Sequence, residues 1–345
     1  MPDGFEPAYI YARVCGSLAR SYLGARAAGL ASSHRVGEAW RAIFGEAPPA
    51  MPESELATAA ELGIRSRAYE ATRRIAGNLA QHDPFLSALL RKWEFAYVKS
   101  LLSAIVEGAP EAPSVDDGRL TLSLGLRLVP SFAVGPYPKL DAMLSGTRYA
   151  WVVDTGLDDL PGVKNKLDRQ YYAELWDSAK ALPARLAGSV TDLIRVEVEL
   201  ENVIWGLRLK RYYSMDAAQI EALLIALPGA DVKSSAQRAI GLRADSRSEW
   251  ADWSWESLVP DSGRDDGGDW YLDLRGLESA ASVYLFRKLY RRLHLEPDCY
   301  VPLYSYFRIK EFEARALCGI IEGIRLEAPA AEIASFAAKT TGERA

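Results

Sequence analysis

The sequence predicts an all-α protein made of three similar helical lobes. Two observations favour this fold class: a helix-like segment occurs three times, and apolar residues recur at helical spacing along most of the chain. Each repeated segment has an acid first and apolar residues one, four and eight positions later. The segments are Glu94–Leu102, Glu199–Leu207 and Glu313–Ile321. Self-similarity at long intervals is typical of duplicated units that stack, so we expect lobes over residues 1–145, 146–250 and 251–345.

The first lobe begins with a stretch that has the spacing of one helix, from Ala8 to Ala31. A stripe of apolar residues four apart runs along it: Ile10, Val14, Leu18 and Tyr22. Helical patterns continue over residues 54–81. Asp83 and Pro84 then predict a new helix start, because Asp is a preferred N-cap and Pro suits the first helical position.

Two later stretches interrupt the helical pattern. Leucines alternate with polar residues over 119–130, which is the period of a strand, and predict a short hairpin or extended connection because no other long stretch alternates. Residues 246–276 are irregular and carry four tryptophans, with a Gly/Asp part that predicts a loop. Helices are expected again over Leu277–Leu295 and Pro302–Leu326.

The composition favours a globular protein and argues against several function classes. The chain has 345 residues, 49% of them apolar, and a net charge of −5, without the basic stripe of a nucleic-acid binder. Three cysteines without CxxC spacing or a Cys/His cluster argue against zinc and fit a reducing compartment. The N-terminus lacks the order of a signal peptide, and no apolar run reaches the roughly 18 residues of a membrane span.

Enzymatic functions find little support. Asp158 and Asp159 are half of an aspartate-rich magnesium pattern, and the run Asp265–Asp269 lacks the terminal Glu of an EF-hand calcium loop, so solvated acidic turns are the favoured interpretation of both. The three histidines are scattered, and no Gly-rich phosphate loop with its Lys-Ser/Thr is present. We therefore expect no catalytic residue, no cofactor and no metal.

Basic pairs mark one edge of the helix expected over Leu277–Leu295. Arg287-Lys288 and Arg291-Arg292 recur four residues apart beside Leu285, Leu289 and Leu293. This pattern is compatible with a helix lying on a membrane surface, but it favours an amphipathic core helix with a solvated basic edge.

The acid that opens each repeated segment lies on or beside the apolar face of its helix, since offsets of 4, 7 or 8, and 11 share a face. A carboxylate there is costly without a cationic or hydrogen-bonding partner, so we expect each lobe to contain one. In the second copy Asn202 shares this face. The acids either orient neighbouring helices, which is the favoured hypothesis, or contact a partner protein.

Four passages together carry a family resemblance. They are Tyr9–Val14, which contains Arg13; Leu167–Tyr172; Glu199–Arg208, which contains Asn202; and Pro302–Gly323, which contains Lys310, Glu311 and Glu313. With the repeated segment at Glu94, they resemble the C-subunit family of archaeal and bacterial V-type (A-type) rotary ATPases, whose eukaryotic counterpart is the d subunit. The chain departs from the family pattern because the asparagine occurs only as Asn202 and the arginine only as Arg208, which suggests a divergent member.

The resemblance implies a funnel of three lobes in a pseudo-threefold arrangement around a central opening. It implies a mechanical, non-catalytic role, in which the protein passes torque between ATP turnover in the head and proton or sodium movement through the membrane sector. The implied partners are the central-shaft subunits and the membrane rotor ring, at the cytoplasmic face of the inner membrane, with membrane association only through other subunits. The family-motif residues, either structural or at an interface, are Arg13, Glu94, Glu199, Asn202, Arg208, Lys310, Glu311 and Glu313.

The alternative is a free-standing helical-repeat adaptor that binds some other protein. The helix containing Lys310, Glu311 and Glu313 discriminates the two hypotheses, because a generic repeat scaffold has no reason to place this motif after Pro302 and Tyr306. The rotary-ATPase component is therefore the favoured interpretation.

Overall fold

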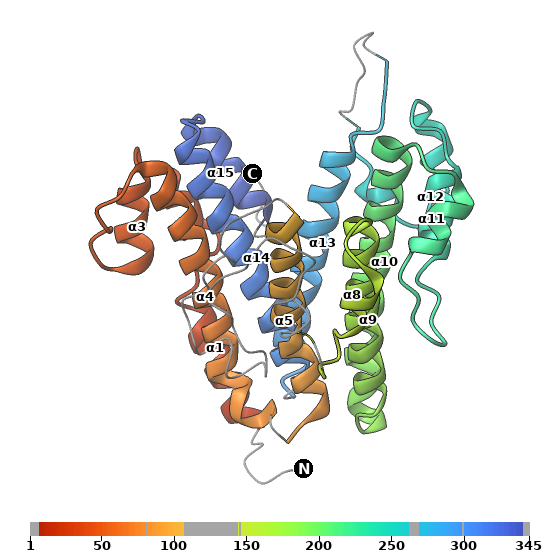
Figure 1. The fold of residues 1–345 in the computed structure, drawn as a ribbon, viewed down its shortest axis with the longest axis horizontal. Helices are drawn as coiled ribbons and strands as arrows, with labels where there is room; N and C mark the ends of the chain where they lie inside the picture. The colour runs from red at the N-terminus through yellow and green to blue at the C-terminus, as the bar shows by residue number, and fades with distance from the viewer. Residues whose placement is uncertain are drawn as a thin grey trace.

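The computed structural model describes residues 7–80, 82–106, 144, 146–261, 269–298 and 300–340. Within these ranges all regular structure is helical, and no β-strand is present (Figure 1). The predicted all-α class is therefore confirmed for the described part of the chain. None of the helices in these ranges combines the length and the apolar character that a membrane span requires.

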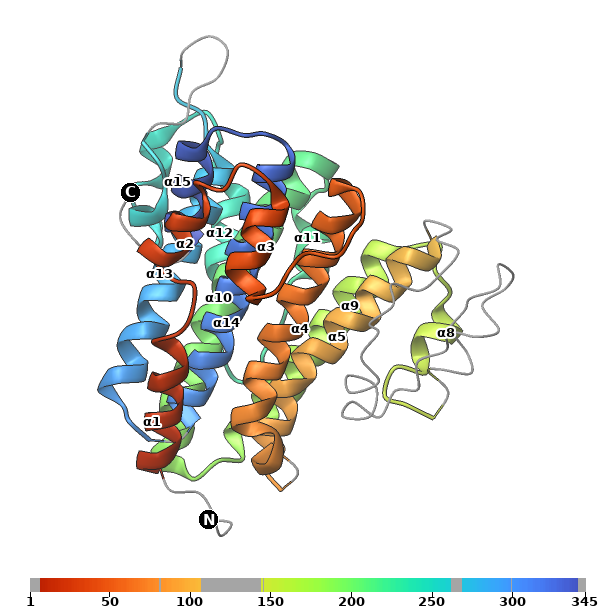
Figure 2. The same ribbon diagram turned by 90° about the vertical axis from the view of Figure 1, so that its left-hand side faces the viewer.

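Six long helices form the body of the molecule. They are α4 (Glu53–Ala80), α5 (Pro84–Val106), α9 (Leu160–Lys180), α10 (Ala184–Tyr213), α13 (Leu274–Leu295) and α14 (Tyr300–Arg325). Consecutive members pack as three pairs, α4 with α5, α9 with α10, and α13 with α14. More extensive contacts join α5 to α9 and α14 to α4, and less extensive ones join α10 to α13, so the six helices touch in a closed circuit (Figures 1 and 2).

Shorter helices cover this body. On one side α1 (Pro7–Leu18), α2 (Ala25–Leu30), α3 (Val36–Phe44) and α15 (Ala330–Thr340) lie around α4 and α14, and on the other α11 (Ala217–Leu223) and α12 (Ser234–Gly241) pack on α10 (Figure 1). The remaining pieces are α8 (Trp151–Thr155), η1 (Arg247–Trp250) and η2 (Glu256–Leu258).

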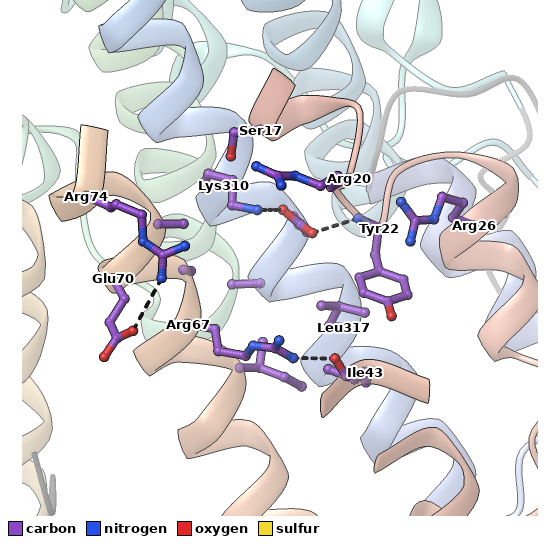
Figure 3. Close-up of a pocket in the computed structure, with 15 residues that line it drawn as sticks. Ser17, Arg20, Tyr22, Arg26, Ile43, Arg67, Glu70, Arg74, Lys310 and Leu317 are labelled. Atoms are coloured by element: carbon purple, nitrogen blue, oxygen red, sulfur yellow. Dashed lines mark hydrogen bonds and ion pairs between the residues drawn. The ribbon is translucent and has the colours of Figure 1, made fainter. Parts of the chain in front are cut away.

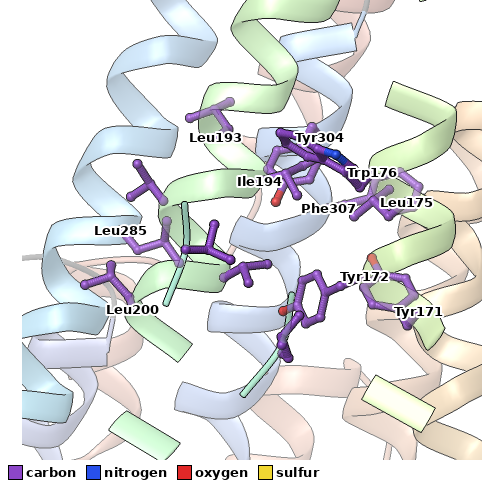
Figure 4. Close-up of a cluster of buried hydrophobic side chains, with 14 of the residues drawn as sticks. Tyr171, Tyr172, Leu175, Trp176, Leu193, Ile194, Leu200, Leu285, Tyr304 and Phe307 are labelled. Carbon is purple, nitrogen blue, oxygen red and sulfur yellow. The ribbon is translucent and has the colours of Figure 1, made fainter. Parts of the chain in front are cut away.

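The largest core lies between the long helices. Figure 4 shows its central part, where aromatic residues of α9 and α14 meet leucines and isoleucine of α10 and α13. Leu193, Ile194 and Tyr304 have no exposed surface there. Burial of such a side chain stabilises the fold by about 1.5–3 kcal/mol. A second core joins α2, α3, α4 and α15 to the C-terminal half of α14.

Local chemistry explains several helix starts. The backbone N–H of Leu86 donates to the Asp83 side chain at 2.9 Å, so the predicted cap of α5 is confirmed. Asp159 caps α9 in the same way through Gly162 N–H at 3.0 Å, which agrees with the interpretation of this acidic pair as a turn. The helices predicted over 54–81, 277–295 and 302–326 are confirmed to within a few residues.

The prediction of one continuous helix over Ala8–Ala31 was wrong. Helix α1 ends at Leu18, and α2 begins only at Ala25, after Gly24 with a φ of 56°. That left-handed conformation favours glycine and breaks the helical path. Tyr22 continues the apolar period, but its backbone N–H donates to the Glu313 carboxylate at 2.7 Å instead of to a helical carbonyl.

The basic helix α13 belongs to the core, as the favoured interpretation has it. Leu289 and Leu293 are fully buried, and Lys288 and Arg292 lie 3.2 Å and 3.1 Å from the Asp192 carboxylate of α10. Some predicted features lie outside the described residues: the alternating stretch over 119–130, the acidic residues 265–268, and Cys299.

Candidate functional site

The three repeated acids occupy equivalent places in the fold. Glu94, Glu199 and Glu313 lie on α5, α10 and α14, each the second helix of its pair, and are 6%, 9% and 5% exposed. Burial at this level requires compensation for each carboxylate. The partners differ from one helix to the next.

Glu94 lies among the Arg91 and Arg148 guanidiniums and the Tyr149 hydroxyl. Burial raises the pKa of Glu94 to about 7, although these three neighbours oppose the shift. This acid therefore titrates near neutral pH, unlike a solvated glutamate.

Glu199 is held by the tryptophan-rich region, to which the sequence assigns no role. The Trp255 indole N–H donates to its carboxylate at 2.9 Å, the Ser235 hydroxyl donates to the same oxygen, and Arg195 donates to the other oxygen at 3.3 Å. Trp250 and Trp253 of the same region are also buried, and the Trp253 indole donates to the Ser235 carbonyl at 2.9 Å. This segment is therefore a packed cover over α10 and α12.

Asn202 fastens the same helix to the connection that follows α11. Its amide donates to the carbonyls of Ile225 and Val232 at 2.9 Å and 2.8 Å, and its side-chain oxygen accepts from Ile225 N–H at 2.8 Å. Asn202, Ile225 and Val232 are all buried. These bonds explain an asparagine at this position as a structural residue.

Glu313 joins α14 to the N-terminal segment. Its carboxylate accepts from Tyr22 N–H and from the Lys310 ammonium, and Lys310 also donates to the Ser21 hydroxyl at 3.1 Å. The predicted pair Lys310 and Glu313 therefore fixes the connection between α1 and α2. Arg13 adds a second tie by donating to the Arg74 carbonyl of α4 at 2.9 Å.

A buried ion network lies where the three helix pairs meet. We call it the Arg308 network; its members are Lys92 (α5), Tyr172 (α9), Glu197 (α10), and Tyr304, Arg308 and Glu311 (α14). The Arg308 guanidinium donates to both oxygens of Glu197, through Nε at 2.7 Å, and also to Glu311. The Tyr172 hydroxyl donates to Glu197 at 2.6 Å and the Tyr304 hydroxyl donates to its other oxygen.

Lys92 completes the Arg308 network from the first helix pair. Its ammonium lies 3.8 Å from the Glu197 carboxylate, donates to the Tyr172 hydroxyl at 3.1 Å and stands over the Tyr171 ring at 4.9 Å. Desolvation, with Arg308 as a second cause, lowers the pKa of Lys92 to about 8. Two cations thus face two carboxylates, and every helix pair contributes at least one of the four charges.

The Arg308 network has a simple relation to the repeat. Lys92, Glu197 and Glu311 each stand two residues before the repeated acid of their helix. Equivalent positions of three repeated units thus come together at one place.

A charged cleft opens beside the Arg308 network, between α10, α13 and α14. We call it the α10–α14 cleft; it has a volume of about 220 Å³, and its charged lining comprises Glu197, Glu201, Arg208, Glu278, Arg308, Glu311 and Arg315. Arg208 and Glu278 form an ion pair across it, with side chains 42% and 38% exposed. The α10–α14 cleft brings together two predicted residues, Arg208 and Glu311. Its paired charges suit docking of a polar surface.

The described residues contain no group of three or more His, Cys, Asp or Glu side chains placed to hold a metal ion. The family model of the ATP synthase (C/AC39) subunit matches residues 50–336. This chain belongs to the ATP synthase (C/AC39) subunit family.

Two relatives resemble this chain over different shares of its length. An uncharacterized protein of Treponema pallidum (strain Nichols) is 24% identical over 329 residues, covering 92% of this chain and 92% of that protein. The C subunit of the A-type ATP synthase of Methanosarcina mazei is 26% identical over 245 residues, covering 68% of this chain and 64% of that protein. The resemblance found in the sequence motifs is thereby confirmed.

For this member of the ATP synthase (C/AC39) subunit family, sequence reasoning missed the centre of the Arg308 network. Glu197 and Arg308 each lie outside the nine-residue repeated segment, so the repeat does not mark them. A signal was nevertheless present: the position two residues before the repeated acid is charged in all three copies, as Lys92, Glu197 and Glu311. Extending the repeat by two residues would have found these three members.

Proposed function

We propose that this protein is a non-catalytic coupling component of a rotary V/A-type ATPase. It would link the central shaft of the catalytic head to the membrane rotor ring and transmit torque for proton or sodium transport, or for ATP synthesis. The observation that carries the proposal is the family match over residues 50–336. The name of the Methanosarcina relative, the C subunit of an A-type ATP synthase, supports the same assignment.

The helix arrangement supports the mechanical part of the proposal. A part that transmits torque must resist twisting, and three helix pairs closed into a circuit, with charges from every pair meeting at their junction, supply such stiffness. We propose three lobes, at residues 1–145, 146–250 and 251–345, in a pseudo-threefold, funnel-shaped arrangement. Each proposed lobe contains two consecutive long helices that contact each other, α4 with α5, α9 with α10 and α13 with α14, and the lobes are joined by more extensive packing of α5 on α9 and of α14 on α4.

The family-motif residues receive two roles in this proposal. Glu94, Glu199 and Glu313 orient helices, since each is buried against its own set of partners. Arg208 and Glu311 belong to an interface, since they line the α10–α14 cleft with part of their surface exposed. We propose that the protein lies at the cytoplasmic face of the inner membrane, where it is attached through the shaft and the rotor ring.

The test is binding of the purified chain to the purified central-shaft subunits of the same ATPase, followed by co-elution at low and moderate salt. A stoichiometric complex is the expected result. The charge reversal Arg208→Glu should weaken the complex, because it places a fifth carboxylate in the cleft. The matched control Arg238→Glu, on exposed α12 away from the cleft, should leave it unchanged.

Absence of a complex, with both partners shown to be folded, would contradict the proposal and favour a free-standing adaptor.

A second experiment tests the coupling role itself. ATPase complexes reconstituted in vesicles without this chain should hydrolyse ATP without pumping ions, and adding the chain should restore pumping. Equal pumping with and without the chain would refute the coupling role.

A further inference from the structure

A cavity on the side of the molecule opposite α11 and α12 carries an excess of positive charge. It lies between α1, α3, α4 and α14, beneath the connection from α1 to α2, and has a volume of about 340 Å³ (Figure 3). We call it the arginine cavity; its charged residues are Arg20, Arg26, Arg67, Glu70, Arg74, Lys310 and Glu313. Among the described residues that line it, five bases and two acids give an excess of three positive charges, in a chain whose net charge is −5.

The acids of the arginine cavity are already engaged. Glu313 accepts from Lys310 and from Tyr22 N–H, and the Glu70 carboxylate lies 3.9 Å from the Arg74 guanidinium. Within the described part of the chain, Arg26 and Arg67 contact carbonyl oxygens and aromatic rings instead of carboxylates. Like charges gathered in one place repel one another, so an anion bound among them would relieve that repulsion.

Two of the arginines, Arg26 and Arg67, are held in place by contacts around the cavity. Arg67 donates to the Ile43 carbonyl at the end of α3 and stands over the Phe44 ring at 5.3 Å, while Arg26 stands over the Tyr22 ring at 5.0 Å. Tyr22 is itself fixed at both ends, by its N–H to Glu313 and by its hydroxyl, which donates to the Ala42 carbonyl at 2.5 Å. The cavity rim is therefore organised before any ligand arrives.

We propose that the arginine cavity binds a small phosphate-bearing anion with at least two negative charges, with pyrophosphate as the simplest example. Arginine suits this chemistry, because its planar fork donates two parallel hydrogen bonds to phosphate oxygens. The half-enclosed volume favours a compact free anion over a lipid surface or a polymer. This site is separate from the α10–α14 cleft and from the proposed coupling role.

The experiment titrates sodium pyrophosphate into the full-length chain by isothermal calorimetry, with chloride adjusted to hold the ionic strength constant. We expect one saturable site on the wild-type chain, and weaker binding of inorganic phosphate. The double variant Arg20→Gln/Arg26→Gln should bind pyrophosphate at least about tenfold more weakly, because two charge-assisted contacts are lost. Both residues are exposed, so the fold should be kept, as circular dichroism melting would verify.

The matched control is Arg238→Gln, an exposed arginine on α12 that does not line the cavity. It removes positive charge elsewhere and should leave the affinity unchanged. Lack of saturable binding by the wild-type chain, or an equal loss in the control, would overturn the proposal. A parallel arm uses phosphatidylglycerol vesicles. Vesicle binding that the double variant loses, without any binding of pyrophosphate, would assign the site to a lipid headgroup and overturn the free-anion assignment.

Discussion

Replacing Arg308 by Met tests whether the Arg308 network holds the three helix pairs together. Methionine is unbranched, flexible and apolar, so the change removes the charged guanidinium group while the rest of the side chain can still fill the site. Glu197, which is 1% exposed, then loses both hydrogen bonds from the guanidinium. It keeps the hydroxyls of Tyr172 and Tyr304 and the Lys92 ammonium at 3.8 Å.

The expected cost follows from what remains around Glu197. Removing one partner of a buried ion pair destabilises a protein by about 3–5 kcal/mol, because it leaves an uncompensated charge. Since two hydroxyls and Lys92 remain, we expect the lower end, about 3 kcal/mol. For a chain of this length that corresponds to a fall of roughly 4 °C in melting temperature.

Thermal melting of three variants measures the effect as a double-mutant cycle. Glu197→Gln alone should cost about 2 kcal/mol, because Arg308 keeps Glu311 as a partner. The double variant should cost less than the sum of the singles by at least about 1 kcal/mol, since it removes one charge of each sign and leaves Lys92 and Glu311 to balance each other. The control is Arg315→Met, an exposed arginine on the same helix, which should stay within about 0.5 kcal/mol of wild type. Additive costs, or an Arg308 variant that melts like the control, would refute the reasoning.

Three further predictions concern the repeated acids and Asn202. The pKa of Glu94 is about 7 in the folded state against an ordinary value of 4.5, so the folded protein binds more protons between these values and stability falls as pH rises through them. Glu94→Gln should remove this fall, of about 3 kcal/mol, in melting curves recorded from pH 5 to 8; an unchanged slope would contradict the assigned cause. Asn202→Ala should lower the free energy of unfolding in urea by about 2–4 kcal/mol, because the Ile225 N–H and two carbonyls lose their hydrogen-bond partner. A loss smaller than about 1 kcal/mol would show that water replaces the amide. Trp255→Phe keeps an aromatic ring but removes the donor to Glu199, so about 1–2 kcal/mol should be lost in the same assay, and an unchanged midpoint would rule out a role for that bond.

The long helices could be predicted because their information is local. Apolar spacing over twenty or more residues, with an aspartate cap before Pro84, determines α4, α5, α13 and α14 to within a few residues. The expectation that buried repeat acids need partners also follows from general electrostatics, and Glu199 and Glu313 have hydrogen-bonded partners. The sequence of a helix is therefore enough to show which of its side chains must be buried.

Features decided by distant contacts could not be predicted in the same way. The stripe of α1 continues through Tyr22, yet the helix stops at Leu18, and the Tyr22 N–H is bound by Glu313, far along the chain. Trp255 lies in a stretch whose sequence predicts only irregular structure, but its indole N–H donates a hydrogen bond to the Glu199 carboxylate on α10. Such partners are chosen by tertiary packing, which no periodicity within one segment encodes.

The Arg308 network places charged side chains, and not apolar ones, at the junction of the three helix pairs, and this choice suits a coupling protein. An apolar junction of the same size would hold the helix pairs at least as firmly, because buried ion pairs seldom add net stability over hydrophobic packing. An apolar junction, however, tolerates sliding of one helix past another, whereas Arg308 meets both oxygens of Glu197 in only one register. We therefore infer that the network sets the relative position of the three helix pairs more than their strength of association. In the proposed coupling role, the Arg308→Met and Glu197→Gln double variant would then stay folded but couple ATP hydrolysis to ion transport less tightly. The measurement is the number of ATP molecules hydrolysed per ion pumped, which should rise in the variant. Full coupling in that variant would show that packing alone sets the register.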